Sequence, residues 1–589
     1  MENETKRNIS LTGDIKFTGL RLKQPMETSA GLLGVKEALR HGFKEMGIVR
    51  SMRSLLEMNQ EDGFRCPSCA WPVPEHPSKI AEYCENGAKA LADEATRDHI
   101  GADFFAEHSV EELSRLSDFE LNKLGRIVEP MVLRPHSVHY EAISWQDAFE
   151  LISDELHQLK NPNEAIFYTS GRSSNEAAYL YGMFARAFGT NNMPDCSNMC
   201  HESSGVALSE TLGIGKGSVK LDDLYGAEVI LVVGQNPGTN HPRMLSALEK
   251  CKKNGGKVIS INPLAETGLV NFKNPQSVSD MLGNGQPIAD IHLPVKINED
   301  VALAKLILKK LVALDATANN VLDHEFIVEY VDGYDELLRD LDRYDVESLQ
   351  QKSGVYMHKI DKVVELLAEN SKIVICWAMG ITQHKNAVDC IKEYVNILLL
   401  KGAVGKAFAG TCPVRGHSNV QGDRSVGIMH YVSKGLNQKI QEHLNFDPPT
   451  EKGYDTVEAI EAMHEKKAKV FICLGGNFVM AASDTKYTAE AVQNCELTVQ
   501  ISTKLNRSHL ITGKTALVLP TFGRSEKDEK NGELQFLTME SSTGKVRQSK
   551  GLLRPASEHI KSEPEIIALL AHTYFRGNHS MNWYELGQD

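Results

Sequence analysis

Short apolar runs alternate with amphipathic segments from about residue 143 onward. A short apolar run that ends in glycine predicts a buried strand, and apolar residues three or four positions apart predict a helix packed on a sheet. On these criteria we predict strands at 165–169, 228–233, 257–261, 290–295, 372–377, 469–474, 497–502 and 516–519. The helices predicted between them lie at 145–158, 175–188, 242–253, 300–314, 386–400 and 489–494.

Strands that alternate with helices are typical of βαβ units, in which a crossover helix joins two parallel strands. The alternation occurs in two blocks of the chain, so the predicted fold class is α/β, with two doubly wound, Rossmann-like parallel sheets. Ligands of such sheets bind at the carboxyl ends of the strands. Two halves therefore predict two nucleotide-like ligands, or one ligand that spans both.

The first part of the chain is helical and rich in loops. Helices are predicted at 34–46, 50–58 and 110–125, with another that runs from shortly after Cys84 to about residue 94. We interpret this part as a separate N-terminal lobe. After the last predicted strand, the tail contains one apolar helix at about 563–573.

Composition narrows the choice of partners and compartment. The net charge of −14 argues against a nucleic-acid or anionic-membrane partner, which needs a basic face, although a local basic channel for an anionic cofactor is compatible with it. No apolar run is long enough to span a membrane, and the polar start of the chain lacks a signal-peptide pattern. The odd number of cysteines, 11, favours free thiols in a reducing compartment, so we predict a cytoplasmic protein.

Cys200 and His201 place a soft metal ligand beside a proton acceptor, on a predicted loop. An isolated cysteine is more often a small buried apolar residue. This one follows a helix that stops at Gly189 and precedes a nucleotide-type βαβ unit, which favours a functional thiol. Cys196 lies on the same loop without an adjacent base, so we expect it to take no part.

Two polar turns are candidate binding segments. The turn from Gly234 to Pro237 ends a buried strand and precedes a helix, and backbone N–H groups at such a turn bind phosphate. The alternative is a turn without a ligand. Arg415 lies in a polar, glycine-flanked loop that starts at Cys412, where its guanidinium could pair with a carboxylate. By itself, an arginine in such a loop is more often a surface or interdomain residue.

Cys66 and Cys69 form a Cys-x-x-Cys pair on a loop rich in proline, and Cys84 follows. Thiolates at this spacing chelate iron or zinc. The alternatives are a reduced structural pair or a small zinc knuckle. Val73 stands where a further cysteine of a four-cysteine cluster motif would lie, and His76 is a substitute ligand to consider.

Six segments together resemble a known family. In chain order they are Cys66-x-x-Cys69 with Cys84-x-x-Gly87; Phe-Ala-Arg-Ala-Phe-Gly-Thr-Asn-Asn at 184–192; Met-Cys-His at 199–201; Val-Gly-Gln-Asn-Pro-Gly-Thr-Asn-His-Pro at 233–242; Trp-Ala-Met-Gly-Ile-Thr-Gln at 377–383; and Pro-Val-Arg-Gly-His-Ser-Asn-Val-Gln-Gly at 413–422. Over about residues 60–550 the chain resembles the prokaryotic molybdopterin-containing oxidoreductases, specifically formate dehydrogenase alpha subunits, in a branch with an incomplete iron–sulfur cysteine motif.

The resemblance implies the formate dehydrogenase/DMSO reductase architecture. Its expected parts are an N-terminal iron–sulfur lobe at 1–130, one α/β molybdopterin-binding domain from 131–195 plus 416–540, a second at 196–415, and a return segment at 541–589. The family's C-terminal β-rich, dinucleotide-binding domain has no counterpart after about residue 575, so we expect either a truncated chain or a second chain that supplies it.

The resemblance also implies the cofactors and the site. Cys200 is expected to bind molybdenum, held by two molybdopterin guanine dinucleotides, His201 to accept a proton with a pKa near neutrality, and Arg415 to orient a substrate carboxylate. A [4Fe–4S] cluster is expected on Cys66, Cys69 and Cys84. The expected cofactor walls are Gly234, Gln235, Asn236, Pro237, Asn262, Gly380, Thr382, Gln383, Gly475, Gly476, Asn477, Ser502 and Lys504.

Three departures bear on these expectations. The cluster motif lacks a cysteine, Asn86 stands where family members often carry a lysine between cluster and pterin, and Asn262-Pro-Leu replaces the usual Asp-Pro-Arg.

The function implied is two-electron oxidation of formate to CO2, with electrons passed through the cluster to an acceptor protein or subunit. The alternatives are another small oxyanion or organic substrate, a non-catalytic pterin-binding homologue, or a zinc-stabilised binding protein. No nicotinamide-binding motif is present, so any NAD step would need a partner subunit.

Overall fold

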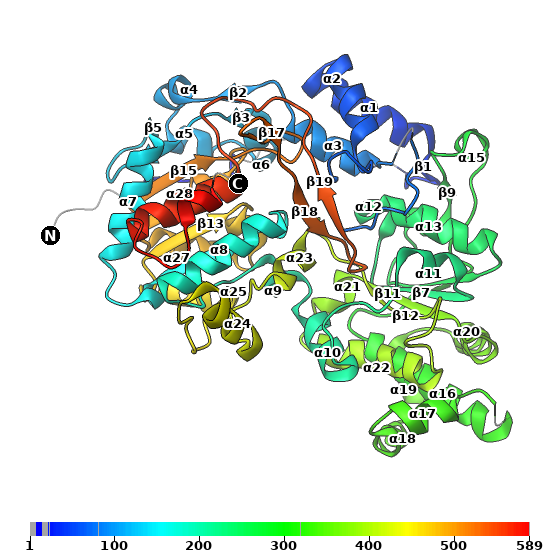
Figure 1. Ribbon diagram of the computed structural model, residues 1–589. Coiled ribbons are helices and arrows are strands. Elements are labelled where there is room, and N and C mark those ends of the chain that lie inside the picture. Colours follow the sequence, from blue (N-terminus) through cyan, green and yellow to red (C-terminus); the bar gives the residue numbers. More distant parts are fainter. Residues whose placement is uncertain (1–6, 15–21, 23, 80–81, 319, 588–589) are drawn as a thin grey trace.

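Two sheets built around parallel strands lie side by side, with a helical N-terminal lobe against both (Figure 1). The computed structural model describes residues 7–14, 22, 24–79, 82–318 and 320–587. A hairpin of β18 (Leu537–Glu540) and β19 (Val546–Ser549) runs between the two halves. None of the helices in the described part of the chain is long and apolar enough to cross a bilayer.

The first sheet has five parallel strands in the order β10-β8-β7-β11-β12. Their bounds are β7 Val229–Val233, β8 Lys257–Ile261, β10 Ile291–Leu293, β11 Ile373–Trp377 and β12 Gly410–Pro413. From β7 the chain builds outward to β8 and β10 on one side, and later to β11 and β12 on the other. The order therefore reverses between β7 and β11, and ligands of such sheets bind at this kind of crevice.

The second sheet takes its strands from distant parts of the chain, in the order β5-β4-β15-β14-β13-β6. Their bounds are β4 Met131–Leu133, β5 Glu141–Ala142, β6 Ala165–Thr169, β13 Val470–Leu474, β14 Leu497–Ser502 and β15 Thr515–Pro520. The last four are parallel, whereas β4 runs antiparallel to β15. The carboxyl ends of four strands therefore meet at one edge of this sheet.

Both sheets are covered on both faces, because every residue of the strands β7, β11, β13 and β14 is buried. In β7, Val229, Leu231 and Val233 pack on one helical layer, and Ile230 and Val232 on the other. The helices over the first sheet are α10 Glu202–Leu212, α13 Pro242–Lys253, α16 Asp300–Ala318, α20 Met357–Glu369 and α22 Ala387–Leu400. Those over the second include α7 Trp145–His157, α8 Asn175–Phe188, α25 Thr456–His464, α27 Thr485–Gln493 and α28 Glu563–Phe575.

Strands and helices were mostly predicted within a few residues, with two informative differences. The helix expected at 110–125 is two short helices, α5 Val110–Ser114 and α6 Asp118–Lys123. Each starts with its own capping box, and the second cap at Ser117 restarts the helix. The segment from Cys412 was expected to be a loop, but it begins inside β12, a short strand whose glycine and proline resemble a turn in the sequence.

Candidate active site

Cys200 lies on a short helix, α9 Cys196–Cys200, so the expectation of a loop is wrong. The helix forms because Asp195 caps it: its side chain accepts a hydrogen bond from the Asn198 backbone N–H at 3.2 Å, and the Asn198 side chain accepts one from the Asp195 N–H at 3.1 Å. His201 is the residue between α9 and α10. The cap therefore fixes where the thiol and the imidazole lie.

The cap is anchored to a distant segment of the chain. Arg424, on α23 Val420–Ser425, donates from Nε to one carboxylate oxygen of Asp195 at 2.8 Å and from Nη2 to the other at 2.9 Å. Its Nη2 also donates to Glu202 at 2.5 Å. Asp195 is almost fully buried, so this bidentate ion pair is an internal contact that holds α9 in place.

Two of the predicted cofactor-wall residues contact Cys200 itself. Thr382 Oγ1 donates to the Cys200 carbonyl oxygen at 2.7 Å, and Gln383 Nε2 donates to the same oxygen at 3.2 Å. Gln383 also reaches the Met199 carbonyl at 2.9 Å. Because Thr382 and Gln383 follow β11, the first sheet fixes the position of the cysteine backbone.

Cys196 does have a base nearby, contrary to expectation. Its Sγ lies 3.1 Å from His417 Nδ1, and the Cys200 thiol donates to the Cys196 carbonyl at 3.3 Å. A hydrogen bond from Cys196, with further help from His417 and Arg415, lowers the pKa of Cys200 to about 6. The same thiol–thiol hydrogen bond, with burial, raises the pKa of Cys196. Cys200 is thus the thiol that the surroundings favour as thiolate.

His201 is fully buried, and burial followed by the charge of Arg415 lowers its pKa well below the ordinary value of 6.5. The expectation of a pKa near neutrality is therefore wrong. Its Nδ1 lies 3.1 Å from Ser204 Oγ, which itself accepts the Trp377 indole N–H at 2.9 Å. Its Nε2 makes no hydrogen bond of standard geometry with the described residues, although the Val414 carbonyl is close enough to influence the pKa.

Arg415 is a buried residue and not a surface one. Its Nε donates to Gln421 Oε1 at 2.9 Å and its Nη2 to the Gly215 carbonyl at 3.1 Å. Its positive charge lowers the pKa of both Cys200 and His201. The structure therefore brings the three predicted residues into one neighbourhood, just after β12 and at the end of α9.

The glycine turns of the first sheet pack against one another. The Gly380 N–H donates to the Gly234 carbonyl at 3.0 Å, and the Gly234 N–H donates to the Ile261 carbonyl at 2.9 Å. A Cβ on Gly380 would lie 2.5 Å from the Gly234 oxygen. These glycines permit a close approach of two backbones, and both N–H groups are already used within the protein.

The side chains beside this turn are linked through one carboxylate. Asn236 Nδ2 donates to Glu266 at 2.7 Å and Asn262 Nδ2 donates to its other oxygen at 3.1 Å. Gln235 is buried, with Nε2 3.4 Å from His241 Nδ1 and no partner among the described residues for Oε1. Pro237 starts the short helix α12 (Pro237–Asn240).

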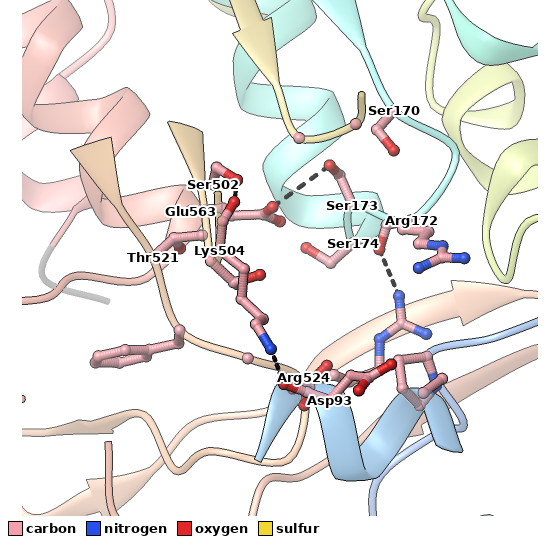
Figure 2. A pocket seen from close by; sticks show the side chains of 18 of the residues that line it. Asp93, Ser170, Arg172, Ser173, Ser174, Ser502, Lys504, Thr521, Arg524 and Glu563 are labelled. Carbon is pink, nitrogen blue, oxygen red and sulfur yellow. Dashed lines mark hydrogen bonds between the residues drawn. The ribbon is translucent and has the colours of Figure 1, made fainter. Parts of the chain in front are cut away.

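A cavity of about 700 Å³ opens at the carboxyl edge of the second sheet, where the loops after β6, β13, β14 and β15 meet (Figure 2). All five predicted wall residues of this half line it: Gly475, Gly476, Asn477, Ser502 and Lys504. Residues that the sequence analysis did not assign also line it: Lys89, Arg172, Ser173, Ser174, His417, Arg524 and Glu563.

The lining of this cavity is rich in cations and polar groups. Burial lowers the pKa of Lys504 to about 8, and its Nζ donates to the Asp93 carbonyl at 3.0 Å. Burial raises the pKa of Glu563 to about 7, although Arg524 opposes the shift. Arg172 follows one predicted strand, and Arg524 lies in the charged loop after another. Their positions after strands could therefore have indicated that they line a ligand site. Nothing in the local sequence marks Glu563.

Cys66, Cys69 and Cys84 line one small cavity of about 50 Å³. Burial raises the pKa of each thiol to about 11. A Cβ on Gly87 would lie 2.8 Å from Cys66 Sγ and 3.8 Å from Cys84 Sγ, so both sulfurs face this glycine. In the described part of the chain, no three or more His, Cys, Asp or Glu side chains are arranged to hold a metal ion. Their role as cluster ligands stays a prediction.

Arg524 connects the cysteines to the large cavity. Its half-buried guanidinium donates to the Cys66 carbonyl at 3.0 Å and to Ser418 Oγ at 2.8 Å. It also donates to the Arg172 carbonyl (Figure 2). Asn86 and Lys89, on α3 (Glu85–Glu94), also line the cavity. Cations therefore lie on the cavity side of the cysteine loop, although Asn86 itself is neutral. His76 is exposed and is not among the residues that line the small cavity.

Two sheets of parallel strands with polar groups gathered at their carboxyl edges define an α/β fold of the doubly wound kind, in which ligands bind at the ends of the strands. Residues 126–560 match the family model described as molybdopterin oxidoreductase. An uncharacterized oxidoreductase of Mycobacterium tuberculosis is 47% identical over 565 residues, which are 95% of this chain and 72% of that protein. The chain therefore belongs to the molybdopterin oxidoreductase family, which implies a molybdenum–pterin cofactor.

Two further similarities are more distant. The alpha subunit of a formate dehydrogenase of Methanocaldococcus jannaschii is 26% identical over 417 residues, which are 69% of this chain and 57% of that subunit. The structure of acetylene hydratase from Pelobacter acetylenicus superposes with a TM-score of 0.60 at 17% identity, and the match covers 78% of this chain and 63% of that one. The structural likeness supports the predicted architecture.

Proposed function

We propose that the chain binds molybdenum as its bis(molybdopterin guanine dinucleotide) complex and oxidises a small anionic substrate by two electrons, with formate to CO2 as the first candidate. The observation that supports this most is the buried thiol of Cys200, whose pKa is lowered and whose carbonyl is held by Thr382 and Gln383. The buried cation of Arg415 beside it suits a substrate with negative charge. The similarity to a formate dehydrogenase subunit favours formate.

The residues present fit such a cofactor. The cavity of about 700 Å³ has the size of a nucleotide-like ligand site, and the cations that line it suit a diphosphate. The buried side-chain atoms without a hydrogen-bond partner among the described residues include His201 Nε2 and Gln235 Oε1. When bound, the cofactor supplies the two-electron chemistry.

The proposed contacts divide between the two sheets. Cys200 would be the thiolate ligand of the metal, since soft metals favour sulfur. One dinucleotide would bind in the large cavity, at Gly475, Gly476, Asn477, Ser502 and Lys504. The other would bind at the switch point of the first sheet, at Gly234, Gln235, Asn236, Pro237, Asn262, Gly380, Thr382 and Gln383.

Arg415 and His201 would act on the substrate. Gln421 and Gly215 hold the guanidinium of Arg415, so its orientation is set before the substrate carboxylate arrives, which favours positional catalysis. The lowered pKa keeps His201 neutral, and in the tautomer whose Nδ1–H donates to Ser204 Oγ the proton would be accepted at Nε2. Electrons would leave through a [4Fe–4S] cluster at Cys66, Cys69 and Cys84 to an acceptor protein or subunit.

Metal analysis tests the cofactor first. We expect about one molybdenum or tungsten per chain in anaerobically purified protein, with about four irons if the three cysteines hold a cluster. The heavy metal without iron would leave a pterin enzyme whose electrons leave by another route. Zinc alone, or no metal, would contradict the proposal and favour a binding protein or a non-catalytic homologue.

Cys200→Ala should abolish dye-coupled formate oxidation while the pterin stays bound, because the thiolate ligand is lost. Cys495→Ala is the matched control, since Cys495 is equally buried but lies in a different core cluster, away from the site. Retained turnover in Cys200→Ala would refute its assignment. If the metal is present but formate is not oxidised, nitrate and other small oxyanions are the next substrates to test.

Arg415→Ala should raise the KM for formate more than it lowers kcat, because it removes the cation that is proposed to bind the carboxylate. The measurement is dye-coupled kinetics over a range of formate concentrations. An unchanged KM would argue against this role.

A further inference from the structure

The helix α2 (Ile48–Glu57) carries an exposed apolar face at the outer edge of the N-terminal lobe (Figure 1). Ile48 is 65% exposed, Val49 80%, Met52 40% and Leu56 43%. These positions fall on one side of a helix of 3.6 residues per turn. Single exposed apolar residues are ordinary, but a contiguous group on one helix face is typical of an interaction site. We call these four residues the α2 face.

The helical segment at 31–57 carries more exposed cations than acids, although the whole chain is acidic. The exposed basic residues of this region are Lys36, Arg40, Lys44, Arg53 and Arg97. The guanidinium of Arg97 lies against Gly47, the residue that precedes α2. The exposed or half-exposed acids on α1 (Gly31–Met46) and α2 are Glu37 and Glu57, and Asp98, next to Arg97, is also exposed. Because the chain has a net charge of −14, this is a local basic rim, which attracts an acidic partner.

The three cysteines Cys66, Cys69 and Cys84 (the cysteine trio) lie near the small hydrophobic core beneath α2. Leu55, on the buried side of α2, packs in one cluster with Met58, Ala88 and Leu91, and Cys66 packs against that cluster. A Cβ on Gly87 would lie 3.7 Å from Met58 Cε and 2.8 Å from Cys66 Sγ. The α2 face is thus the nearby exterior of the segment that holds the three cysteines.

We propose that the α2 face is the docking surface for a small, acidic electron-carrier protein that receives the electrons of the reaction. This inference rests on the proposed function, because it requires electrons to leave through the cysteine trio. A single apolar helix face with a charged rim suits the small interfaces of redox encounters.

Direct binding tests the inference without requiring turnover. The full chain would be immobilised, and an acidic bacterial ferredoxin and an acidic flavodoxin would be passed over it at low and high ionic strength. We expect at least one of the two to bind, with an affinity that falls as salt is added. Val49→Asp and Arg53→Glu should each weaken binding by about tenfold or more.

Two matched controls isolate the surface from general effects. Val328, on α17 (His324–Tyr330), is 88% exposed and far along the chain from α2, so Val328→Asp adds the same charge elsewhere. Arg343 has a side chain that is 75% exposed, and Arg343→Glu is the control for charge reversal. Both controls should bind the carrier within about twofold of the unmodified chain.

Several results would overturn the inference. They are no binding of either carrier, equal weakening in the α2 and control variants, binding to phosphatidylglycerol vesicles that Val49→Asp abolishes, or a dimer that Val49→Asp dissociates. The proposed function fails separately, through metal content or dye-coupled formate oxidation. Val49→Asp should keep the dye-coupled rate and lose only the rate with the protein carrier.

Discussion

The ion pair of Asp195 and Arg424 offers a direct test of how the site is held in place. The change is Arg424→Gln, which removes the cation from a carboxylate that is only 1% exposed. Both carboxylate oxygens accept from Arg424, at 2.8 Å and 2.9 Å. The same carboxylate caps α9, the helix that ends in Cys200. Removing its partner Arg424 should therefore loosen the segment that carries the Cys200 thiol.

Breaking a buried ion pair by removing one partner costs about 3–5 kcal/mol. The lower end applies here, because burial already raises the pKa of Asp195 and the acid keeps its hydrogen bond from the Asn198 N–H. About 3 kcal/mol corresponds to roughly a hundredfold change in an equilibrium constant. If the loss is confined to α9 and its surroundings, local opening there should increase by about that factor.

Hydrogen exchange resolved on peptides that cover residues 197–205 measures this opening. The informative amides are His201, whose N–H donates to the Ser197 carbonyl at 3.0 Å, and Gly205, whose N–H donates to the His201 carbonyl at 3.1 Å. Arg339→Gln is the control, since Arg339 pairs with Glu336 on the surface and both side chains are 68% exposed. That pair should contribute about 0–1 kcal/mol and leave the exchange at 197–205 unchanged.

A second variant separates the buried charge from the cap. Asp195→Asn in the Arg424→Gln background removes the unpaired carboxylate but keeps a good N-cap residue, so most of the protection should return. Protection at residues 197–205 that is unchanged in Arg424→Gln would refute the anchoring role. A double variant no better protected than Arg424→Gln would refute the unpaired charge as the cause.

Two further predictions concern backbone packing and pH. Gly380→Ala should lower the thermal midpoint of unfolding, because the new Cβ would lie 2.5 Å from the Gly234 oxygen and such overpacking costs about 1–3 kcal/mol. Gly435→Ala is the control, since a Cβ there meets open space and should not lower the midpoint. Equal midpoints for the two variants would contradict the prediction. Between pH 4.5, the ordinary pKa of a glutamate, and about pH 7, Glu563 holds a proton in the folded chain but not in the unfolded chain, so stability should fall as pH rises through this window. Glu563→Gln should flatten this part of the curve of thermal midpoint against pH. An unchanged slope would contradict the prediction.

The elements of the fold could be predicted where local pattern decides them. The strand at 165–169 and the helix at 242–253 have the predicted bounds, because buried parallel strands and sheet-covering helices have distinct periods. The short strand β12 was missed because its glycine and proline give no strand signal and its burial comes from pairing with β11. Pairing between distant segments has no local signature.

The site was predictable in its residues and less so in its contacts. Cys200, His201 and Arg415 do share one neighbourhood, but Cys196 was set aside because its base, His417, comes from a segment far along the chain. The lowered pKa of His201 likewise comes from burial and from Arg415. Neither effect can be predicted from the residues next to His201 in the sequence. Glu563 enters the large cavity from the far end of the chain.

The glycine turns show why the same sequence signal has two structural meanings. Gly234 and Gly380 follow parallel strands, but their turns pack backbone against backbone and the two N–H groups bond within the protein. Gly475 and Gly476 also follow a strand and have positive φ, yet they line a large cavity, and a Cβ there would first meet the side chains of Ser170 and Tyr168. A glycine after a strand therefore predicts a close approach; whether to a ligand or to another backbone depends on the neighbouring loop. The cavity therefore supports a ligand-binding role for the glycines of the second sheet more than for those of the first.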